Sequence, residues 1–342
     1  MSLKKEIKTK LFFFLLIPFF SWFFLHTIFF GDKQKFDQLA LGKKTIAIKN
    51  YINNKPINCG SYLQLEECLN YIKDKKFKKR ILWVGNSQLD SVNQGNVITS
   101  KLASYRVSKY FYDKEIGVMT FAAPNISFQE SFVVIKHLKK KIHFDAIILP
   151  LVFDDTREGE VRESFIIKNK KTPKTFQEIS ENKIILYLDK RIKWNKIRSS
   201  AQGKIYTFLY KTRNLIFRIK PTSTRKSIKP IFDKNILFLE KILKEAKESD
   251  VKMILYVAPL RNDIKIPYDK IEYHSFIRYT KNLSINFSSN FYNLENVVPK
   301  FLWGEKAGTN IGADTEVDFM HFKEQGHAIL AKNIISILDK LF

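Results

Sequence analysis

The sequence predicts an α/β protein with a largely parallel, doubly wound sheet of five strands. Short apolar runs of the length typical of buried strands alternate with longer stretches in which apolar residues recur at helical spacing. This alternation is typical of parallel sheets that helices cover on both faces. We expect strands at residues 80–84, 117–123, 145–153, 252–258 and 290–297, and helices at residues 128–141, 234–248 and 324–341.

The N-terminal region predicts a membrane anchor ahead of this domain. Residues 11–30 form an almost unbroken apolar segment that is long enough to cross a bilayer, and lysines precede it. We expect residues 1–10 to be a cytoplasmic basic tail and residues 11–30 an uncleaved signal anchor, because no small-x-small cleavage pattern follows. A cleaved signal peptide is the alternative. The anchored, single-pass topology places the rest of the chain on the periplasmic or extracellular side of the inner or cytoplasmic membrane.

Two further regions precede and interrupt the predicted sheet. Residues 31–78 are expected to form a charged stem and a helical cap, which contains the only two cysteines, Cys59 and Cys68. Their short spacing permits a local disulfide in an oxidising compartment, and two buried thiols are the alternative. Residues 160–233 are basic and rich in aromatic residues, and we expect an inserted subdomain or lid within the domain at 79–342. This insertion is either a surface for an acyl carrier, a polymer or a membrane partner, or simply a solvated insertion.

The net charge of +25 invites a nucleic-acid partner, but the distribution of the charge argues against one. The lysines are spread along the chain, and neither a helix-turn-helix pattern nor an RNP-like aromatic signature appears. An exported basic domain is more naturally attracted to anionic lipid headgroups or to acidic polymers of the cell envelope. The sequence has no CxxC pair and no cluster of histidines and cysteines, so we expect neither a metal site nor another cofactor.

Polar residues follow the predicted strands at the edge where parallel sheets bind ligands. Asn86 and Ser87 come directly after Gly85 at the end of the first strand, which is a rigid mount for a nucleophile. Asp318 and His321 stand three residues apart, in the loop that we expect to enter the last helix. A nucleophilic serine needs a base to accept its proton, and the base needs a carboxylate to orient it. Ser87, His321 and Asp318 are therefore candidate catalytic residues for acyl transfer or ester hydrolysis.

These motifs resemble those of the SGNH (GDSL-like) hydrolase superfamily, over roughly residues 79–341. The Gly85-Asn86-Ser87 turn resembles the first sequence block of that family, and Asp318-Phe319-Met320-His321 resembles its last block. The resemblance implies a flavodoxin-like three-layer sandwich. It also implies that Ser87 is the nucleophile, His321 the general base and then acid, and Asp318 the orienting carboxylate.

The blocks between these motifs depart from the family pattern. The resemblance implies that a glycine N–H and an asparagine side chain assist the serine N–H at the oxyanion. Here no glycine ends the second strand, where Asn125 lies, and Asp154 follows the third strand in place of the asparagine. An ionised aspartate repels an oxyanion, whereas a protonated Asp154, or a donor such as Asn125, Arg157 or Asn86, can replace the missing donor. A loop salt bridge is the structural alternative for Asp154 and Arg157, and Arg157 and Arg261 are candidates for binding a substrate phosphate or carboxylate.

Within the superfamily, an N-terminal anchor followed by an exported domain resembles the proteins that modify cell-envelope polymers. Examples are the D-alanine-transfer proteins of teichoic acid synthesis and the polysaccharide O-acetylation proteins. The resemblance implies an acyl esterase or O-acyltransferase that acts on a cell-envelope polymer or acylated carrier, beside a membrane-bound O-acyltransferase. Two alternatives stay open: a simple lipase or lysophospholipase, and a membrane-anchored binding or assembly protein with a degenerate site that holds an acidic polymer or a partner through its basic insertion.

Overall fold

The computed structural model describes most of the predicted sheet domain. The chain divides into two compact units, of which the larger consists of residues 43–168, 221–306 and 315–342. The described part of the smaller unit is helical over residues 208–216. The residues that the structure describes are 45–74, 76–159, 161–162, 205, 208–220, 223–308 and 315–342.

The predicted basic tail at residues 1–10, the anchor at residues 11–30 and most of the insertion at residues 160–233 lie outside the described residues. Among the helices that the structure does describe, none is both long and apolar enough to span a bilayer. The membrane anchor therefore stays a prediction of the sequence.

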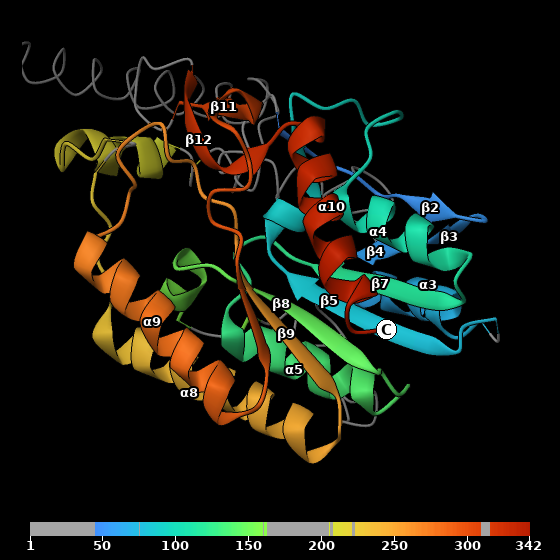
Figure 1. Ribbon diagram of the computed structural model, residues 1–342. Helices are drawn as coiled ribbons and strands as arrows, with labels where there is room; N and C mark the ends of the chain where they lie inside the picture. The colour runs from blue at the N-terminus through green and yellow to red at the C-terminus, as the bar shows by residue number, and fades with distance from the viewer. Residues whose placement is uncertain are drawn as a thin grey trace, which may run out of the picture. The chain divides into compact units, whose positions relative to one another are not determined.

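A six-stranded sheet forms the centre of the larger unit, and all neighbouring strands in it are parallel (Figure 1). The order along the sheet is β10 (Asn290–Asn293), β9 (Lys252–Val257), β8 (Ala146–Leu151), β5 (Lys79–Gly85), β7 (Ile116–Ala122) and β4 (Asn58–Cys59). The sheet has one strand more than the five predicted. The additional strand is the edge strand β4, which comes from the segment predicted as stem and cap. Without β4, the order is the flavodoxin-like 2-1-3-4-5.

Helices cover both faces of this sheet, so the larger unit is a three-layer sandwich (Figure 1). One face is covered by α3 (Tyr62–Ile72), α5 (Phe128–Lys139), α8 (Lys229–Glu248) and α9 (Lys270–Asn286). The other face is covered by α4 (Ala103–Tyr112) and α10 (Glu324–Asp339). The predicted α/β class and parallel sheet are thus confirmed.

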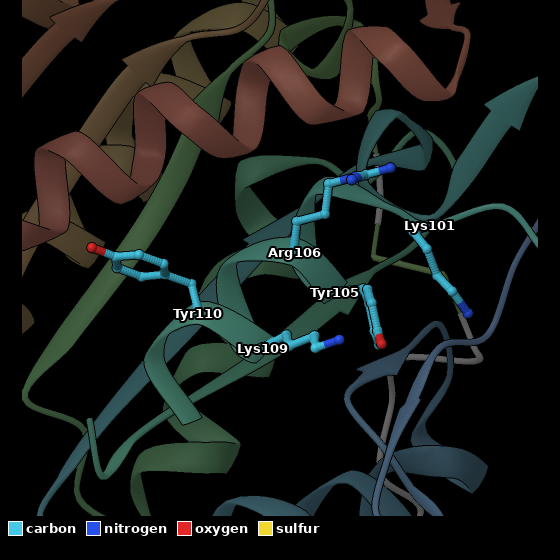
Figure 2. A pocket seen from close by; sticks show the side chains of 5 residues that line it. All are labelled: Lys101, Tyr105, Arg106, Lys109 and Tyr110. Carbon is cyan, nitrogen blue, oxygen red and sulfur yellow. The ribbon is translucent and has the colours of Figure 1, made fainter. Parts of the chain in front are cut away.

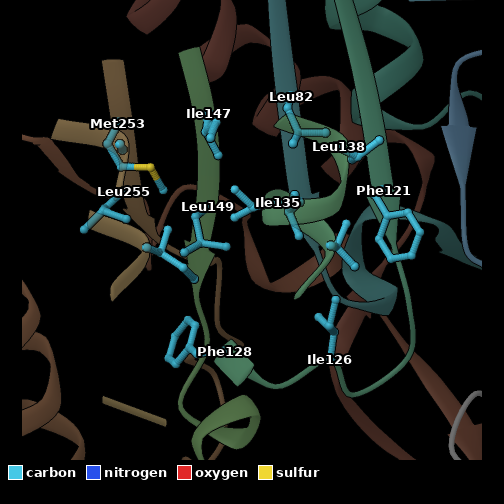
Figure 3. Close-up of a cluster of buried hydrophobic side chains, with 14 of the residues drawn as sticks. Leu82, Phe121, Ile126, Phe128, Ile135, Leu138, Ile147, Leu149, Met253 and Leu255 are labelled. Carbon is cyan, nitrogen blue, oxygen red and sulfur yellow. The ribbon is translucent and has the colours of Figure 1, made fainter. Parts of the chain in front are cut away.

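Side chains alternate between the two faces along the central strand β5. Leu82 and Val84 enter the core on the side of α5 and α8, whereas Ile81 and Trp83 enter the core on the side of α4 and α10. Figure 3 shows the first of these cores, with Leu82 of β5 near Leu138 of α5. Burial on both faces explains why the strands appear in the sequence as continuous apolar runs. It also makes their carboxyl ends rigid points from which side chains project.

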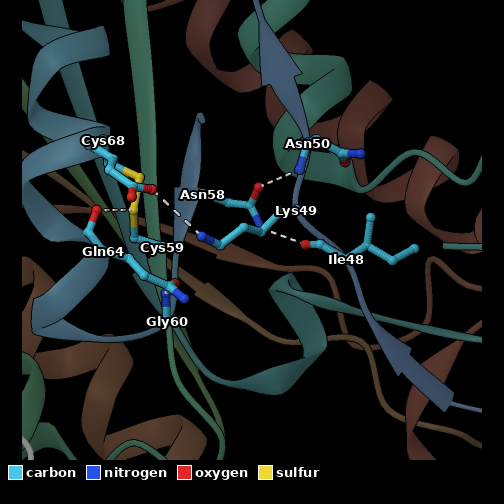
Figure 4. Close-up of a disulfide and its surroundings, with 9 residues drawn as sticks. Ile48, Lys49, Asn50, Asn58, Cys59, Gly60, Gln64 and Cys68 are labelled. Atoms are coloured by element: carbon cyan, nitrogen blue, oxygen red, sulfur yellow. Dashed lines mark hydrogen bonds and ion pairs between the residues drawn. A yellow bond between two sulfur atoms is a disulfide. The ribbon is translucent and has the colours of Figure 1, made fainter. Parts of the chain in front are cut away.

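A disulfide joins β4 to α3 at the edge of the sheet (Figure 4). Cys59 ends β4, Cys68 lies in α3, and both side chains are buried. Asn58, the other residue of β4, accepts a hydrogen bond from the Asn50 N–H and donates one to the Ile48 carbonyl. Side-chain and covalent bonds therefore hold a strand that is only two residues long.

Candidate active site

The candidate nucleophile lies in the tight turn that follows β5. Ser87 begins a single 3₁₀ turn, η1, which ends at Leu89 and has Asn86 as its N-cap. The Asn86 side chain accepts a hydrogen bond from the Gln88 N–H at 3.0 Å and so fixes the start of the turn. Gly85 is required before the turn, because a Cβ there would lie 2.6 Å from Leu89 Cδ1. The Gly-Asn-Ser sequence thus lets the chain turn sharply at the end of a buried strand.

Three candidate residues from distant parts of the chain form one series of hydrogen bonds. His321 Nε2 lies 2.9 Å from Ser87 Oγ, and His321 Nδ1 lies 2.9 Å from Asp318 Oδ2. All three residues are nearly buried, with exposed fractions of 6% for Ser87, 4% for His321 and 1% for Asp318. In this arrangement one imidazole nitrogen can accept the serine proton while the other donates to the carboxylate.

Asp318 accepts enough hydrogen bonds to stay ionised despite its burial. Its Oδ1 accepts from the N–H groups of Met320 and His321 at 2.9 and 3.0 Å, and its Oδ2 accepts from Asn93 Nδ2 at 3.2 Å. Burial by itself would raise the pKa of the Asp318 carboxyl. The charge and hydrogen bond of His321, together with the backbone donors, outweigh burial and lower the pKa to about 2. The carboxylate can therefore orient His321 and stabilise its cation.

The structure places Asp318 and His321 on a strand, which corrects the prediction of a loop. Both lie in β12 (Thr315–Phe322), which pairs with β11 (Trp303–Ala307) in a separate two-stranded sheet. The strand has no continuous apolar run because Glu316 and Asp318 are themselves buried in it. Because of these buried charged side chains, apolar periodicity did not identify β12 as a strand.

Arg261 braces the strand that carries the base. Its Nη1 donates to the carbonyl oxygens of Gly304 at 2.8 Å and Asp318 at 3.5 Å. Its Nε and Nη2 bind the Asp263 carboxylate. These contacts favour a structural role for Arg261 over the predicted role in binding a substrate anion.

Asp154, which follows β8, is surrounded by donors of its own. Its Oδ1 accepts from Arg157 Nη1 at 3.3 Å, and its Oδ2 accepts from Arg225 Nη1 at 2.5 Å and from the Tyr268 hydroxyl at 3.1 Å. Arg157 Nε also donates to the Lys226 carbonyl. Asp154 and Arg157 thus form the loop salt bridge that the sequence left open as the structural alternative, and we expect neither side chain to donate to an oxyanion.

Asp155, rather than Asp154, approaches the nucleophile turn. Asn86 Nδ2 donates to both carboxyl oxygens of Asp155 at 3.2 Å, and Asp155 is 4% exposed. Burial raises the pKa of the Asp155 carboxyl well above its ordinary value, although the hydrogen bond from Asn86 opposes this shift. Asn86 uses both ends of its amide within the protein, so its contacts position the turn instead of facing a substrate.

Two of the predicted oxyanion donors, the Ser87 N–H and the Asn125 side chain, donate to none of the acceptors described above. The Ser87 N–H opens the 3₁₀ turn and therefore has no acceptor within it. Asn125 lies just beyond the end of β7, the neighbour of β5, with an exposed side chain. Its backbone is left-handed, with φ at 50°, a conformation that asparagine adopts more readily than most residues. Asn125 is thus the candidate for a second donor.

Two buried amide side chains that the sequence analysis did not single out hold the site together. Gln88 Nε2 donates to the carbonyl oxygens of Pro259 at 3.0 Å and Met320 at 2.9 Å, which ties the nucleophile turn to β12. Asn93, in β6 (Ser91–Asn93), donates to Asp318. Neither the alternation of apolar residues nor the spacing of charged residues in the sequence marks a buried neutral amide. The position of Gln88 directly after Ser87 is the signal that could have indicated it.

Within the described part of the chain, no group of three or more histidine, cysteine, aspartate or glutamate side chains could hold a metal ion. A surface pocket on α4 contains none of the three triad residues (Figure 2). Its side chains are basic or phenolic, and they are Lys101, Tyr105, Arg106, Lys109 and Tyr110. This pocket could hold an anionic group, and no serine, cysteine or histidine lines it.

No family model and no curated protein matches this chain. Among solved structures, it is similar to a GDSL-like lipase from Bacteroides thetaiotaomicron, with 11% identity, a TM-score of 0.42, and 82% of this chain and 97% of that chain covered. An acetylxylan esterase from Geobacillus stearothermophilus gives 11% identity, a TM-score of 0.43 and coverage of 76% and 94%. A lipase/acylhydrolase from Enterococcus faecalis has 12% identity and a TM-score of 0.39, and the match covers 76% of this chain and 95% of that chain. Because these likenesses are low, the class of the protein rests on its own geometry: an α/β sandwich with a buried Ser–His–Asp series at the end of its central strand.

Proposed function

We propose that this protein is a serine esterase or O-acyltransferase of the SGNH (GDSL-like) type, which forms an acyl-enzyme on Ser87. The observation that carries the proposal is the unbroken contact from Ser87 Oγ through His321 to Asp318, with 2.9 Å on each side of the imidazole. The series lies at the carboxyl end of a parallel sheet, where proteins of this architecture bind ligands.

The geometry supports a two-step mechanism. His321 Nε2 takes the proton from Ser87 Oγ as the oxygen attacks the ester or thioester carbonyl, and Asp318 stabilises the imidazolium that forms. His321 then gives the proton to the departing alkoxide or thiolate, which leaves the acyl group on Ser87. In the second step His321 takes a proton from a sugar hydroxyl or from water, and that oxygen attacks the acyl carbonyl. His321 then returns the proton to Ser87 Oγ as the serine leaves. The Ser87 N–H and Asn125 are the proposed donors to the oxyanion in both steps.

We further propose that the protein acts outside the cytoplasm on a cell-envelope polysaccharide or other polymer. The apolar segment at residues 11–30 supports an anchored, exported domain. The Cys59–Cys68 disulfide is typical of an oxidising compartment. The net charge of +25 favours attraction to an acidic polymer. An acylated carrier or a membrane-bound O-acyltransferase would then supply the acyl group.

Acyl transfer from an activated ester tests this proposal. Full-length protein incubated with 4-nitrophenyl acetate should release nitrophenol and carry an acetyl group on Ser87, which mass spectrometry after an acid quench can locate. Ser87→Ala should lose both signals and keep the wild-type circular dichroism spectrum. Acetylation of an added oligosaccharide would distinguish a transferase from an esterase. Undiminished nitrophenol release by the Ser87→Ala variant would overturn the proposal.

One observation favours a second candidate, a binding or assembly protein with a degenerate site. Asp154 stands where the resemblance implies an asparagine donor, and Arg157 and Arg225 hold it. The loss of one oxyanion donor typically costs about 10²–10³ in turnover, which slows an enzyme without abolishing its acyl-enzyme. A degenerate site, unlike a slow enzyme, should leave no acetyl group on Ser87 with any ester donor.

A further inference from the structure

The loop between β6 and α4, at residues 94–101, carries two adjacent aliphatic side chains at its tip. Val97 is 65% exposed, and Ile98 is 84% exposed, which is the highest exposed fraction among the large hydrophobic side chains that the structure describes. Single exposed aliphatic residues are common on protein surfaces and need no partner. A neighbouring pair at the tip of a loop is a candidate contact with an apolar partner, if its surroundings favour one.

Hydrogen bonds around Asn96 hold this tip in place. Asn96 Oδ1 accepts from the N–H groups of Ile98 at 2.8 Å and Thr99 at 3.3 Å. The Asn96 N–H donates to Ser100 Oγ at 2.8 Å, and the Asn96 carbonyl accepts from the Ser100 N–H at 3.0 Å. Because these groups bond within the turn, the tip can enter an apolar environment without losing their partners.

Basic side chains follow the aliphatic tip. Residues 94–112 contain no aspartate or glutamate, whereas Lys101, Arg106 and Lys109 fall among them. Lys101 and Lys109 line the pocket on α4 together with Tyr105 (Figure 2), and no described carboxylate lies within ion-pair distance of either lysine. Surfaces that bind anionic bilayers combine the same features: lysines for the headgroups, and tyrosine and aliphatic side chains for the interface.

The N-terminal part of the chain enters the domain beside this loop. β1 (Thr45–Ala47) pairs antiparallel with β6, and Thr45 lies opposite Asn93, the last residue before the loop. The predicted anchor ends at residue 30, so residues 31–44 connect it to Thr45. A segment of this length spans at most about 50 Å when fully extended. The anchor would therefore keep this end of the domain near the bilayer and raise the effective concentration of the loop at the lipid surface.

We propose that the loop at residues 94–101 and the basic face of α4, formed by Lys101, Tyr105 and Lys109, dock on an anionic lipid surface. The inference rests on the membrane anchor of the proposed function and adds an orientation of the domain to it. Asn93, directly before the loop, donates to Asp318 at 3.2 Å, so docking brings the triad close to the membrane surface. An acidic polymer would engage the lysines alone, whereas a bilayer also takes up the aliphatic tip.

Full-length protein in lipid nanodiscs tests the inference. The only two cysteines of the chain form the Cys59–Cys68 disulfide, so Ile98→Cys provides a single free thiol for an environment-sensitive nitrobenzoxadiazole probe. In phosphatidylglycerol discs we expect the emission of the probe to shift to shorter wavelength, and its fluorescence to fall when brominated lipids are included. Ile271→Cys is the matched control, because Ile271 is also an exposed isoleucine, at 80%, but lies on α9. A probe at this position should show neither effect.

A charge variant and a change of lipid test the electrostatic part of the docking. Lys101→Gln in the protein labelled at position 98 should lower the ratio of docked to undocked loop roughly fivefold, the contribution typical of one lysine near an anionic bilayer. Phosphatidylcholine discs should also reduce the quenching. Equal quenching in both lipids would contradict the requirement for an anionic surface.

The same experiment separates docking from the anchor on which it rests. If the protein stays with the discs but the probe at position 98 responds like the probe at position 271, the docking is overturned and the proposed function stands. A probe at position 98 that responds to polygalacturonate and not to lipid would assign the surface to a polymer and overturn the docking as well. Protein that does not remain with the discs would overturn the anchor and the docking together.

Discussion

Two buried carboxyl groups near the nucleophile have opposite environments. Asp318 accepts from two backbone N–H groups, an imidazole and the Asn93 amide, and its pKa falls to about 2. Asp155 accepts from the amide of Asn86, and burial raises its pKa well above the ordinary value. Both carboxyls are buried, so the charge of His321 and the additional donors around Asp318, rather than the depth of burial, decide which carboxyl is ionised at neutral pH. Only Asp318 is suited to stabilise an imidazolium.

Replacing Asp155 by asparagine should stabilise the protein at neutral pH. The folded state holds a proton on Asp155 that the unfolded state loses above its pKa of about 3.9, so this group makes the protein less stable as the pH rises. The effect amounts to about 1.4 kcal/mol per pH unit between the unfolded and folded pKa values. The Asp155→Asn variant keeps an acceptor for Asn86 and removes the titration.

Urea unfolding of wild type and Asp155→Asn at about pH 4 and about pH 8 measures this difference. The two free energies of unfolding should agree at the lower pH, and the variant should be more stable at the higher one. A variant that is less stable than wild type at about pH 8 would show that Asp155 is ionised in the folded protein.

The sequence indicated the triad because its residues combine rare features: a serine at the end of a buried strand, and a histidine with an aspartate three residues before it. The structure brings these residues together. The sequence did not distinguish Asp154 from Asp155, since adjacent residues point in different directions and only the fold decides which one meets Asn86.

At the scale of elements, the site depends on a link between η1 and β12. These elements are more than two hundred residues apart in sequence, and Gln88 joins them through one amide. The same amide also binds Pro259, which follows β9. Because the contact between His321 and Ser87 spans the same two elements, a shift of β12 relative to η1 would lengthen it.

Gln88→Met should lower kcat about tenfold with little change in KM, because it loosens the alignment of base and nucleophile. The variant keeps the side-chain volume and removes both donors. It should also lose about 1–3 kcal/mol of unfolding free energy, since buried carbonyl oxygens lose their partner. Gln129→Met is the matched control, because Gln129 is equally buried and its Nε2 donates to the Gly159 carbonyl at 3.0 Å. The control should lose similar stability and keep its kcat; equal loss of kcat in both variants would contradict a positioning role for Gln88.

Apolar periodicity predicted the elements that bury a continuous apolar surface, namely the five central strands with α5, α8 and α10. It did not indicate β4, because two residues carry no period. It also did not single out α9, whose buried stripe is narrow and includes polar Thr280 and Ser284. Whether a short or partly polar segment forms a strand or a helix thus depends on tertiary packing, which the apolar pattern of the sequence does not show.

At the scale of the whole molecule, the proposed attraction between the net charge of +25 and an acidic polymer requires a basic surface that the polymer can reach. The pocket on α4 combines Lys101 and Lys109 with Tyr105, and Lys101 Nζ lies 4.9 Å from the centre of the Tyr105 ring (Figure 2). Neither lysine has a carboxylate within ion-pair distance among the residues that the structure describes. Their charges are therefore available to an anionic ligand.

The double variant Lys101→Glu/Lys109→Glu should bind an acidic polysaccharide such as polygalacturonate roughly tenfold more weakly at low salt. Fluorescence anisotropy of a labelled polymer measures the affinity, with neutral dextran as the control ligand. Lys270→Glu/Lys281→Glu changes the net charge by the same amount on α9. If both double variants weaken binding equally, the net charge and not this pocket attracts the polymer.

The central claim is that His321 activates Ser87 as a nucleophile. Labelling of full-length protein with a fluorophosphonate probe tests it most directly, since the probe reacts with an activated serine and needs no knowledge of the substrate. We predict that wild type is labelled at Ser87, and that Ser87→Ala and His321→Ala are not labelled although both remain folded. A folded wild-type protein that resists the probe while an active serine esterase is labelled beside it, or labelling that persists in Ser87→Ala, would contradict the account.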